Sequence, residues 1–223
     1  MTQATNYVSR WEDLPEVYRV VKTAKKIAFQ NNPFDKGLHN IFEPFLGKDK
    51  INERSAVLNF DKKGIAATNS HALLHLPYPN KEFIGSYCTL PSCIKLFSDT
   101  EKIEDNKIEG RYPDYPAVIP IDNPYVYPVT IAKLKTYCRA VLEGNYVNKT
   151  TYQVVFAFAD NQPIGFNGKF VMDICNAFEK LGYSKAFIHL STATRAAVFS
   201  PDKDDVRIGK SVLGLLMPVM LSN

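Results

Sequence analysis

The segment from Arg111 to Pro128, RYPDYPAVIPIDNPYVYP, constrains the fold most, because proline recurs in it at every third or fourth position. Proline lacks a backbone N–H and fixes its φ angle, so it breaks helices and is excluded from the inner strands of sheets. The segment therefore predicts a link between two units, which we place at 1–115 and 116–223. A chain of 223 residues is long enough for two such units.

The residues before this segment predict helices on either side of a pair of strands. Apolar residues recur with helical spacing over 12–29 and again over 90–104. Residues 31–50 are rich in proline and glycine, which predicts turns. Residues 55–76 are typical of two strands around a short charged turn.

The residues after the segment predict a similar series. A helix is expected over 130–144, a strand over 151–159 and a second helix over 166–183. Residues 185–200 predict a hairpin, and an apolar strand follows from Val212. Both halves begin with a helix that carries a basic face. The sequence therefore predicts an α+β fold of two related units, each with helices packed on an antiparallel sheet.

The composition narrows the class of protein. A net charge of +4 permits an anionic partner but does not require one. No apolar run approaches the roughly 20 residues that a membrane-spanning helix needs, and the first residues lack the order of a signal peptide. The four cysteines show no paired ligand spacing, so we expect reduced thiols in a cytoplasmic protein without a membrane partner.

Motifs for catalysis and metal binding are missing from the sequence. It contains no GxxxxGK(S/T), GxGxxG, GxSxG or HExxH pattern. His71 and His75 are four residues apart, which on a strand separates them by about 13 Å, too far for one metal ion. We therefore expect no catalytic residue, no metal and no cofactor. The protein is interpreted as non-enzymatic, with a small enzyme as the alternative.

Two of the expected helices carry basic faces with few acidic residues in their central turns. The cations are Arg19, Lys22, Lys25 and Lys26 on the first helix, and Lys133, Lys135 and Arg139 on the second. Such faces suit sequence-independent contact with the phosphates of duplex DNA. A solvated helix face is the alternative interpretation of the same pattern.

Four stretches of the sequence resemble motifs of one protein family, in that family's order. They are AATNSHALL at 66–74, IEGRYPDYPAVIP at 108–120, IGFNGKFVMDICNAFEKL at 164–181 and LLMPVML at 215–221. The family is the sliding clamps of bacterial replication, the beta subunit of DNA polymerase III. The chain resembles a divergent and shortened clamp.

This resemblance implies a function. Sliding clamps are rings of six similar domains that encircle duplex DNA, with basic helices around the hole and an outer groove for peptides of polymerases and other partners. A chain of two units would close such a ring as a homotrimer, and a homodimer is the alternative. The implied function is a replication processivity factor or accessory that binds DNA. The alternative is a clamp-derived adaptor or modulator that binds replication proteins without encircling DNA.

The resemblance also implies a peptide-binding groove between the two units. Its residues are Thr68, Ser70, His71, Leu73, Pro113, Val118, Leu215, Leu216, Met217, Pro218, Val219, Met220 and Leu221. Walls of Leu, Met, Val and Pro are apolar and adaptable, which suits several related peptides. Ordinary core packing is an equal alternative for Leu215 and Leu216.

The sequence departs from the family pattern within this groove. Asn69-Ser70 stands where the family has Asp-Gly, and Ala72 and Met220 stand where it has arginines. The loss of two basic groups makes the expected groove more apolar. The connections before Arg111 and before Ile164 are also shorter than in the family, so we expect a reduced number of strands.

Overall fold

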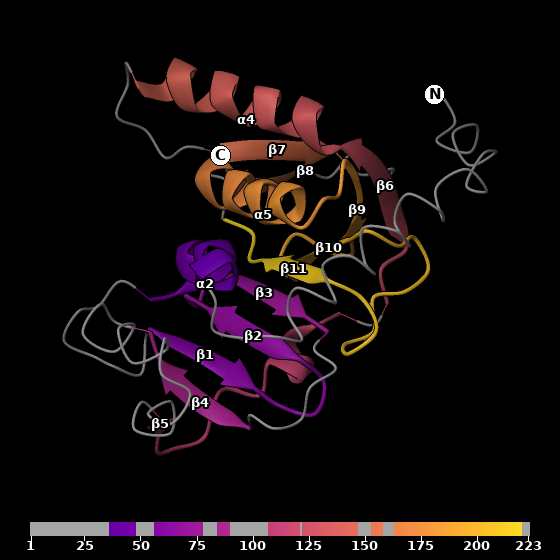
Figure 1. Cartoon of the computed structure of the whole chain (residues 1–223). Coiled ribbons are helices and arrows are strands. Elements are labelled where there is room, and N and C mark those ends of the chain that lie inside the picture. The colour runs from indigo at the N-terminus through magenta and orange to yellow at the C-terminus, as the bar shows by residue number, and fades with distance from the viewer. Residues whose placement is uncertain are drawn as a thin grey trace.

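The structure is a computed structural model of the chain (Figure 1). It describes residues 36–47, 56–77, 84–89, 107–120, 122–146, 153–157 and 163–219. The helices expected over 12–29 and 90–104 lie outside these residues.

Within this part of the chain, nine strands form one antiparallel sheet and two further strands pair with each other. The order in the large sheet is β5-β4-β1-β2-β3-β11-β10-β9-β6. Its strands are β1 (Val57–Phe60), β2 (Ile65–Thr68), β3 (Ala72–Leu76), β4 (Gly85–Cys88), β5 (Lys107–Ile108), β6 (Tyr125–Thr130), β9 (Lys185–Leu190), β10 (Ala197–Ser200) and β11 (Leu213–Leu216). The small sheet pairs β7 (Gln153–Ala157) with β8 (Pro163–Asn167).

The two halves of the chain meet in the middle of the large sheet (Figure 1). Five neighbouring strands come from residues 57–108, and the other four come from residues 125–216. β3 and β11 join them as an antiparallel pair, with Leu73 opposite Leu215. The joint therefore places one motif stretch, 66–74, beside the described part of another, 215–219.

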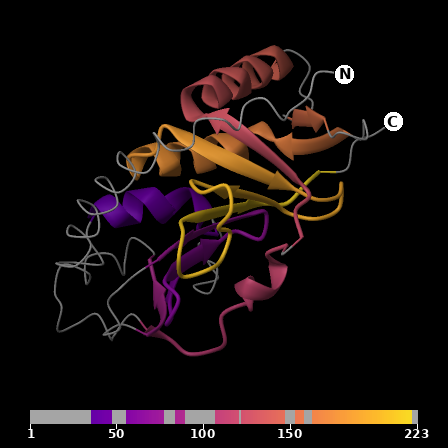
Figure 2. The ribbon, with the colours of Figure 1, turned by 90° about the vertical axis from the view of Figure 1, so that its right-hand side faces the viewer.

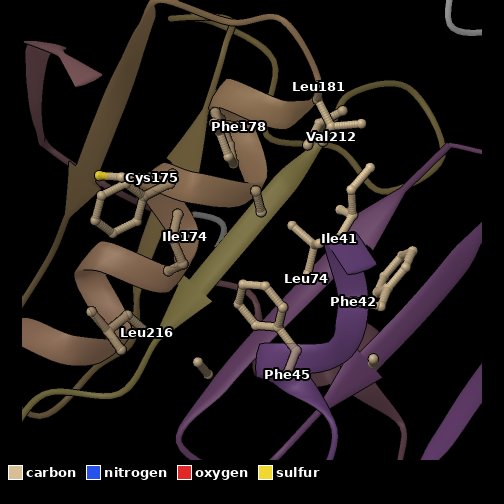
Figure 3. Packing of buried hydrophobic residues seen from close by; sticks show 14 of the residues in the cluster. Ile41, Phe42, Phe45, Leu74, Ile174, Cys175, Phe178, Leu181, Val212 and Leu216 are labelled. Atoms are coloured by element: carbon tan, nitrogen blue, oxygen red, sulfur yellow. The ribbon is translucent and has the colours of Figure 1, made fainter. Parts of the chain in front are cut away.

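The three α-helices of the described residues lie on one side of the sheet, which we call the helix face (Figure 2). They are α2 (Lys36–Phe42), which continues into a 3-10 helix at Glu43–Phe45, α4 (Ile131–Tyr146) and α5 (Gly168–Lys180). Among the described helices, none has the length and apolar character needed to cross a membrane. Figure 3 shows side chains of α2, α5 and β11 meeting in the main core, among them Ile41, Ile174 and Leu216.

Local sequence explains where α5 begins, ends and packs. Asn167 caps its start, because the side-chain oxygen accepts the Lys169 N–H at 2.9 Å. Gly182, with a φ of 86°, follows its last turn in the left-handed conformation that glycine favours. The helix approaches β11 closely at Gly214, where an added Cβ would lie 2.9 Å from a methyl group of Ile174.

The opposite side of the sheet, the pocket face, carries a smaller apolar cluster beneath the proline-rich segment. Tyr115 packs there with Leu73, Val198 and Leu215. The segment forms a 3-10 helix, η6 (Tyr115–Val118), with proline in its first turn. Figure 2 shows the segment on the side of the sheet away from the helices. The segment therefore covers the pocket face near the joint between the two halves.

Several predicted elements are confirmed. The helices expected over 130–144 and 166–183 are α4 and α5, and the hairpin expected over 185–200 is the antiparallel pair β9–β10. Within the proline-rich segment, Pro128 lies in β6, the terminal strand of the described sheet. That position agrees with the exclusion of proline from inner strands.

Other expectations were wrong. The strand expected after the charged turn is two strands, β2 and β3, with a tight turn at 69–71. The region expected to be turns contains α2 and the 3-10 helix that continues it. Together they bury Leu38, Ile41, Phe42 and Phe45, which have the i, i+3, i+4, i+7 spacing of a helix face. The proline-rich segment does contain a short helix, η6, because Pro116 falls in its first turn, where no N–H is needed.

Candidate partner-binding pocket

The turn between β2 and β3 is held by its own side chains. Asn69 Oδ1 accepts the backbone N–H groups of His71 and Ala72 at 3.0 and 2.8 Å. The Thr68 hydroxyl donates to the Ala72 carbonyl at 2.9 Å. These bonds hold Ser70 at a φ of 72°, a conformation that favours glycine. The turn thus presents Ser70 and His71 at the start of β3, beside the end of β11.

His71 is fixed from two sides. Its carbonyl accepts the N–H of Met217 at 2.9 Å, which extends the pairing of β3 with β11 by one bond. Its ring stacks on Phe170 of α5, with 5.5 Å between ring centroids. The side chains of Met217 and His71 are therefore placed by backbone pairing and ring contact rather than by a free loop.

A pocket of about 210 Å³ opens beside this turn on the pocket face. Most of its lining comes from three segments: the β2–β3 turn with β3, the proline-rich segment, and the end of β11. The residues expected in the groove that line it are Thr68, Ser70, His71, Leu73, Pro113, Val118, Leu215 and Met217. Segments from three distant parts of the sequence thus converge on one cavity.

The remaining expected groove residues do not line this pocket. Leu216 is fully buried in the main core on the helix face, because alternate residues of a strand point to opposite sides of the sheet (Figure 3). Pro218 and Val219 follow Met217 beyond the lining, and the Val219 N–H donates to a β8 carbonyl at 2.9 Å. Met220 and Leu221 lie outside the described residues.

Four further residues line the pocket: Ala72, Asp114, Tyr115 and Ala196. Ala72, Asp114 and Tyr115 fall inside the motif stretches, so their neighbourhood in the sequence could have indicated them. Ala196 precedes β10, and no signal in the sequence connects it with the other segments. Its place in the pocket follows only from the β9–β10 hairpin lying next to β11.

Tyr115 ties the pocket floor to the sheet. Its ring is 3% exposed, and its hydroxyl donates to Asp61 Oδ2 at 2.7 Å. Burial, with the Asp61 carboxylate beside it, raises the pKa of Tyr115 well above its ordinary value. His75 stacks beneath, 5.8 Å between centroids, and burial lowers the pKa of its ring to about 4. The floor is therefore uncharged at neutral pH apart from the Asp61 carboxylate beneath it.

The rim of the pocket is apolar and open to solvent. Val118 is 56% exposed and Met217 is 44% exposed, and they are two of the four large hydrophobic residues that the described chain leaves exposed. Large side chains of this kind gather where another molecule covers them. In the same described residues, no group of three His, Cys, Asp or Glu side chains is arranged to hold a metal ion.

The cations of α4 lie on the helix face, and one of them is neutralised. Lys133 and Arg139 are exposed. Lys135 is half-buried and pairs with Glu179 of α5, with 2.6 Å between Nζ and Oε2. The sequence of α4 alone does not indicate this pairing, because the acidic partner comes from a neighbouring helix. Arg19, Lys22, Lys25 and Lys26 lie outside the described residues.

No protein-family model matches the sequence, and no curated protein matches it. The structure is nevertheless similar to many solved structures of bacterial sliding clamps. The beta subunit of DNA polymerase III from Borrelia burgdorferi, in complex with a natural product, matches with a TM-score of 0.60 at 16% identity, over 85% of this chain and 61% of that chain. The clamp from Bartonella birtlesii bound to griselimycin gives 0.59 at 16%, over 83% and 63%. The H. pylori clamp in complex with diflunisal gives 0.57 at 13%, over 83% and 64%.

The chain has a sliding-clamp fold. The α+β clamp architecture predicted from four short motifs is thereby confirmed, at an identity too low for the sequence comparisons to detect. The chain spans 61–64% of the length of the three clamps named above. Within this clamp fold, α4 and the proline-rich segment that lines the pocket lie on opposite sides of one sheet (Figure 2).

Proposed function

We propose that this chain is a clamp-like replication factor that binds short segments of partner proteins, a polymerase among them, in the pocket on its pocket face. One observation carries the proposal: three motif stretches that resemble clamp sequences converge on a single apolar cavity at the joint of the two halves. We also propose that the halves correspond to units at 1–115 and 116–223, and that the protein acts in the cytoplasm without catalysis.

The pocket has the properties of a site for an extended peptide. Its walls are Leu73, Leu215 and Met217 on one side and the rigid Pro113 on the other. An apolar side chain of a partner can fill it while the surrounding turn, already held by its own hydrogen bonds, needs no reordering. Pre-formed sites of this kind lose little entropy on binding.

A library of random nonapeptides tests this proposal. Peptides selected for binding to the protein should lose affinity when Met217→Asp or Val118→Asp places a carboxylate at the apolar rim. Ile84→Asp is the matched control, because Ile84 is 46% exposed and does not line the pocket. All three residues are exposed, so the unfolding midpoints of the variants should stay close to that of the native protein.

We expect a loss of more than tenfold in affinity for both pocket variants and less than about twofold for the Ile84 variant. If selected peptides bind equally well to the Met217→Asp and Val118→Asp variants, the pocket is not the peptide site.

We propose that duplex DNA contacts the helix face through Lys133 and Arg139, which are exposed and have no ion-pair partner among the described residues. Replacement of both by glutamate should weaken binding to duplex DNA and flatten its dependence on salt, because each lost phosphate contact removes a slope of about 0.9. Lys62→Glu, on the β1–β2 turn, makes the same kind of charge change elsewhere and is the control. Unchanged binding in the double variant would exclude α4 as the DNA contact.

A second candidate function is an adaptor of the clamp fold that does not encircle DNA. Two observations favour it. Lys135, one of three cations on α4, is already paired with Glu179. The two end strands of the described sheet are also poor edges for sheet extension, because β5 has two residues and β6 contains Pro128.

Solution mass and DNA topology separate the two candidates. A closed ring predicts a stable trimer or dimer that stays on circular DNA and slides off linear DNA. The adaptor predicts a monomer at high concentration, with equal retention on both forms of DNA.

A further inference from the structure

We infer that the pocket selects partner segments in which a lysine or arginine lies next to the apolar anchor, with Asp114 as the residue that reads this charge. The inference rests on the proposed function, because it requires that the pocket binds a peptide. It adds the chemistry by which one apolar peptide is preferred over another.

The charge around the pocket is one-sided. Of the residues that line it in the described structure, Asp114 is the only acidic one, and none is lysine or arginine. The nearest cations along the chain, Arg111 and Arg195, are exposed and do not belong to the lining. A partner with an acidic residue at this rim meets a like charge, and a partner with a basic residue meets an opposite one.

Asp114 is also available for such a contact. It lies at the start of η6, yet its side chain forms no capping hydrogen bond. Other aspartates of the described chain are engaged: Asp61 accepts the Tyr115 hydroxyl, Asp173 pairs with Lys169, and Asp205 pairs with Arg207. The Asp114 carboxylate has neither a hydrogen bond nor an ion pair with any described residue. Within the η6 turn, Asp114 contributes through its backbone, because its carbonyl accepts the Ala117 N–H at 3.1 Å.

The backbone that carries this carboxylate is restrained by its neighbours. Pro113 and Pro116 flank it closely in sequence and restrict the backbone through their rings. Tyr115, the next residue, is anchored to Asp61 beneath the sheet surface. A charge held on a restrained backbone beside an apolar cavity gives specificity at low entropic cost.

The contact lies at a solvent-exposed rim, so its effect on affinity is modest. Exposed ion pairs change a binding constant by about two- to fivefold, and the effect falls as salt screens the charges. Discrimination between a basic and an acidic neighbour is larger, because attraction in one case is replaced by repulsion in the other. We therefore expect the dissociation constants of two peptides that differ only in a basic or an acidic neighbour to differ about tenfold at low salt.

The experiment uses the nonapeptides selected from a random library on the native protein and on the Asp114→Lys variant. The native protein should enrich lysine and arginine beside the apolar residues, and the variant should enrich aspartate and glutamate. One selected basic peptide and its Lys→Glu counterpart are then titrated against the native protein, Asp114→Asn and Asp122→Asn. Asp122 is exposed in the same proline-rich segment outside the pocket, so it is the matched control.

We expect the Lys→Glu peptide to bind about tenfold more weakly to the native protein and to Asp122→Asn, and less than about twofold more weakly to Asp114→Asn. Equal preference in all three proteins would overturn the role of Asp114, while binding that still depends on Met217 would leave the pocket as the peptide site. If no selected peptide depends on Met217, the pocket itself is not a peptide site and the proposed function fails together with this inference.

Discussion

The two faces of the sheet use apolar side chains in different ways. On the helix face, Phe45, Phe178 and Leu216 are fully buried among helices and strands. On the pocket face, Val118 and Met217 remain largely exposed above a small cluster around Tyr115. Neighbouring residues of β11 divide between the two, since Leu215 faces the pocket and Leu216 faces the core. One short strand therefore contributes to the main core on one side and to the pocket lining on the other.

The charges differ in the same way. On the helix face, Lys135 of α4 pairs with Glu179 of α5, so helix packing neutralises part of the basic pattern. On the pocket face, the Asp114 side chain has no hydrogen-bond or ion-pair partner among the described residues. A charge pattern read along one helix overlooks ionic partners that come from a neighbouring helix. The motif at 66–74, in contrast, contains the side chain that forms its own turn, Asn69.

Truncation of one residue on each face should give the largest contrast. Phe178→Ala is expected to lower the free energy of unfolding by about 3–5 kcal/mol, because it leaves a cavity in the main core. Met217→Ala should lower it by less than about 0.5 kcal/mol, because the side chain is exposed. Urea unfolding of both variants measures the difference. Equal losses would mean that the apolar rim of the pocket is part of the core.

Acid should destabilise the floor beneath the pocket through His75. Burial lowers the pKa of its ring from 6.5 to about 4, so the unfolded chain takes up this proton first as the pH falls. The stability due to neutral His75 is complete above pH 6.5 and is lost progressively between pH 6.5 and about 4, by about 3 kcal/mol in all. His75→Phe keeps an aromatic ring against Tyr115 and should lose correspondingly less stability over this range.

The measurement is the free energy of unfolding by urea at a series of pH values for the native protein and the variant. If the free energy of unfolding had the same pH dependence in both proteins, folding would not lower the pKa of His75.

Ser70→Gly should stabilise the protein by about 0.5–1 kcal/mol. Ser70 has a φ of 72°, where a side chain is strained and glycine is not. Ser184→Gly is the control, because Ser184 is exposed and does not adopt a positive φ, so glycine there should destabilise slightly. Thermal unfolding compares the two. A loss of stability at position 70 would mean that its side chain stabilises the turn by more than the strain costs.

The smallest effect is expected on the helix face. Glu179→Gln should release Lys135 and raise the affinity for duplex DNA by about two- to fivefold, with a steeper salt dependence. Glu143→Gln removes the same charge from exposed α4 without releasing Lys135, so it should change the slope less. DNA titrations at several salt concentrations distinguish the two variants, and identical slopes would mean that Lys135 does not reach DNA.

The sequence was most informative where local pattern and tertiary role coincide. The helical periodicity of 166–183, ending at Gly182, predicted α5. The motif stretches indicated Thr68, Pro113 and Met217 as neighbours, and these residues line one pocket. The two-stranded form of 64–76 escaped prediction, because the turn at Asn69 depends on side-chain hydrogen bonds rather than on glycine or proline.

Features that depend on a distant partner could not be predicted from local pattern. Neither the pairing of Lys135 with Glu179 nor the place of Ala196 in the pocket has a signal in the adjacent sequence. Leu215 and Leu216 were equally apolar candidates, and only the pairing of β11 with β3 decides which of them faces the pocket. Tertiary arrangement, rather than residue type, settled these positions.

The most direct test of the division between the two faces uses its two described methionines. Met217 lies in the pocket, and Met172 lies on α5 against the main core. With methyl-labelled methionine, assigned by Met→Leu variants, a selected nonapeptide is titrated and both methyl resonances are followed by NMR. We predict that the Met217 resonance shifts and the Met172 resonance does not. Binding that shifts Met172 and leaves Met217 unmoved would contradict the pocket face as the partner site.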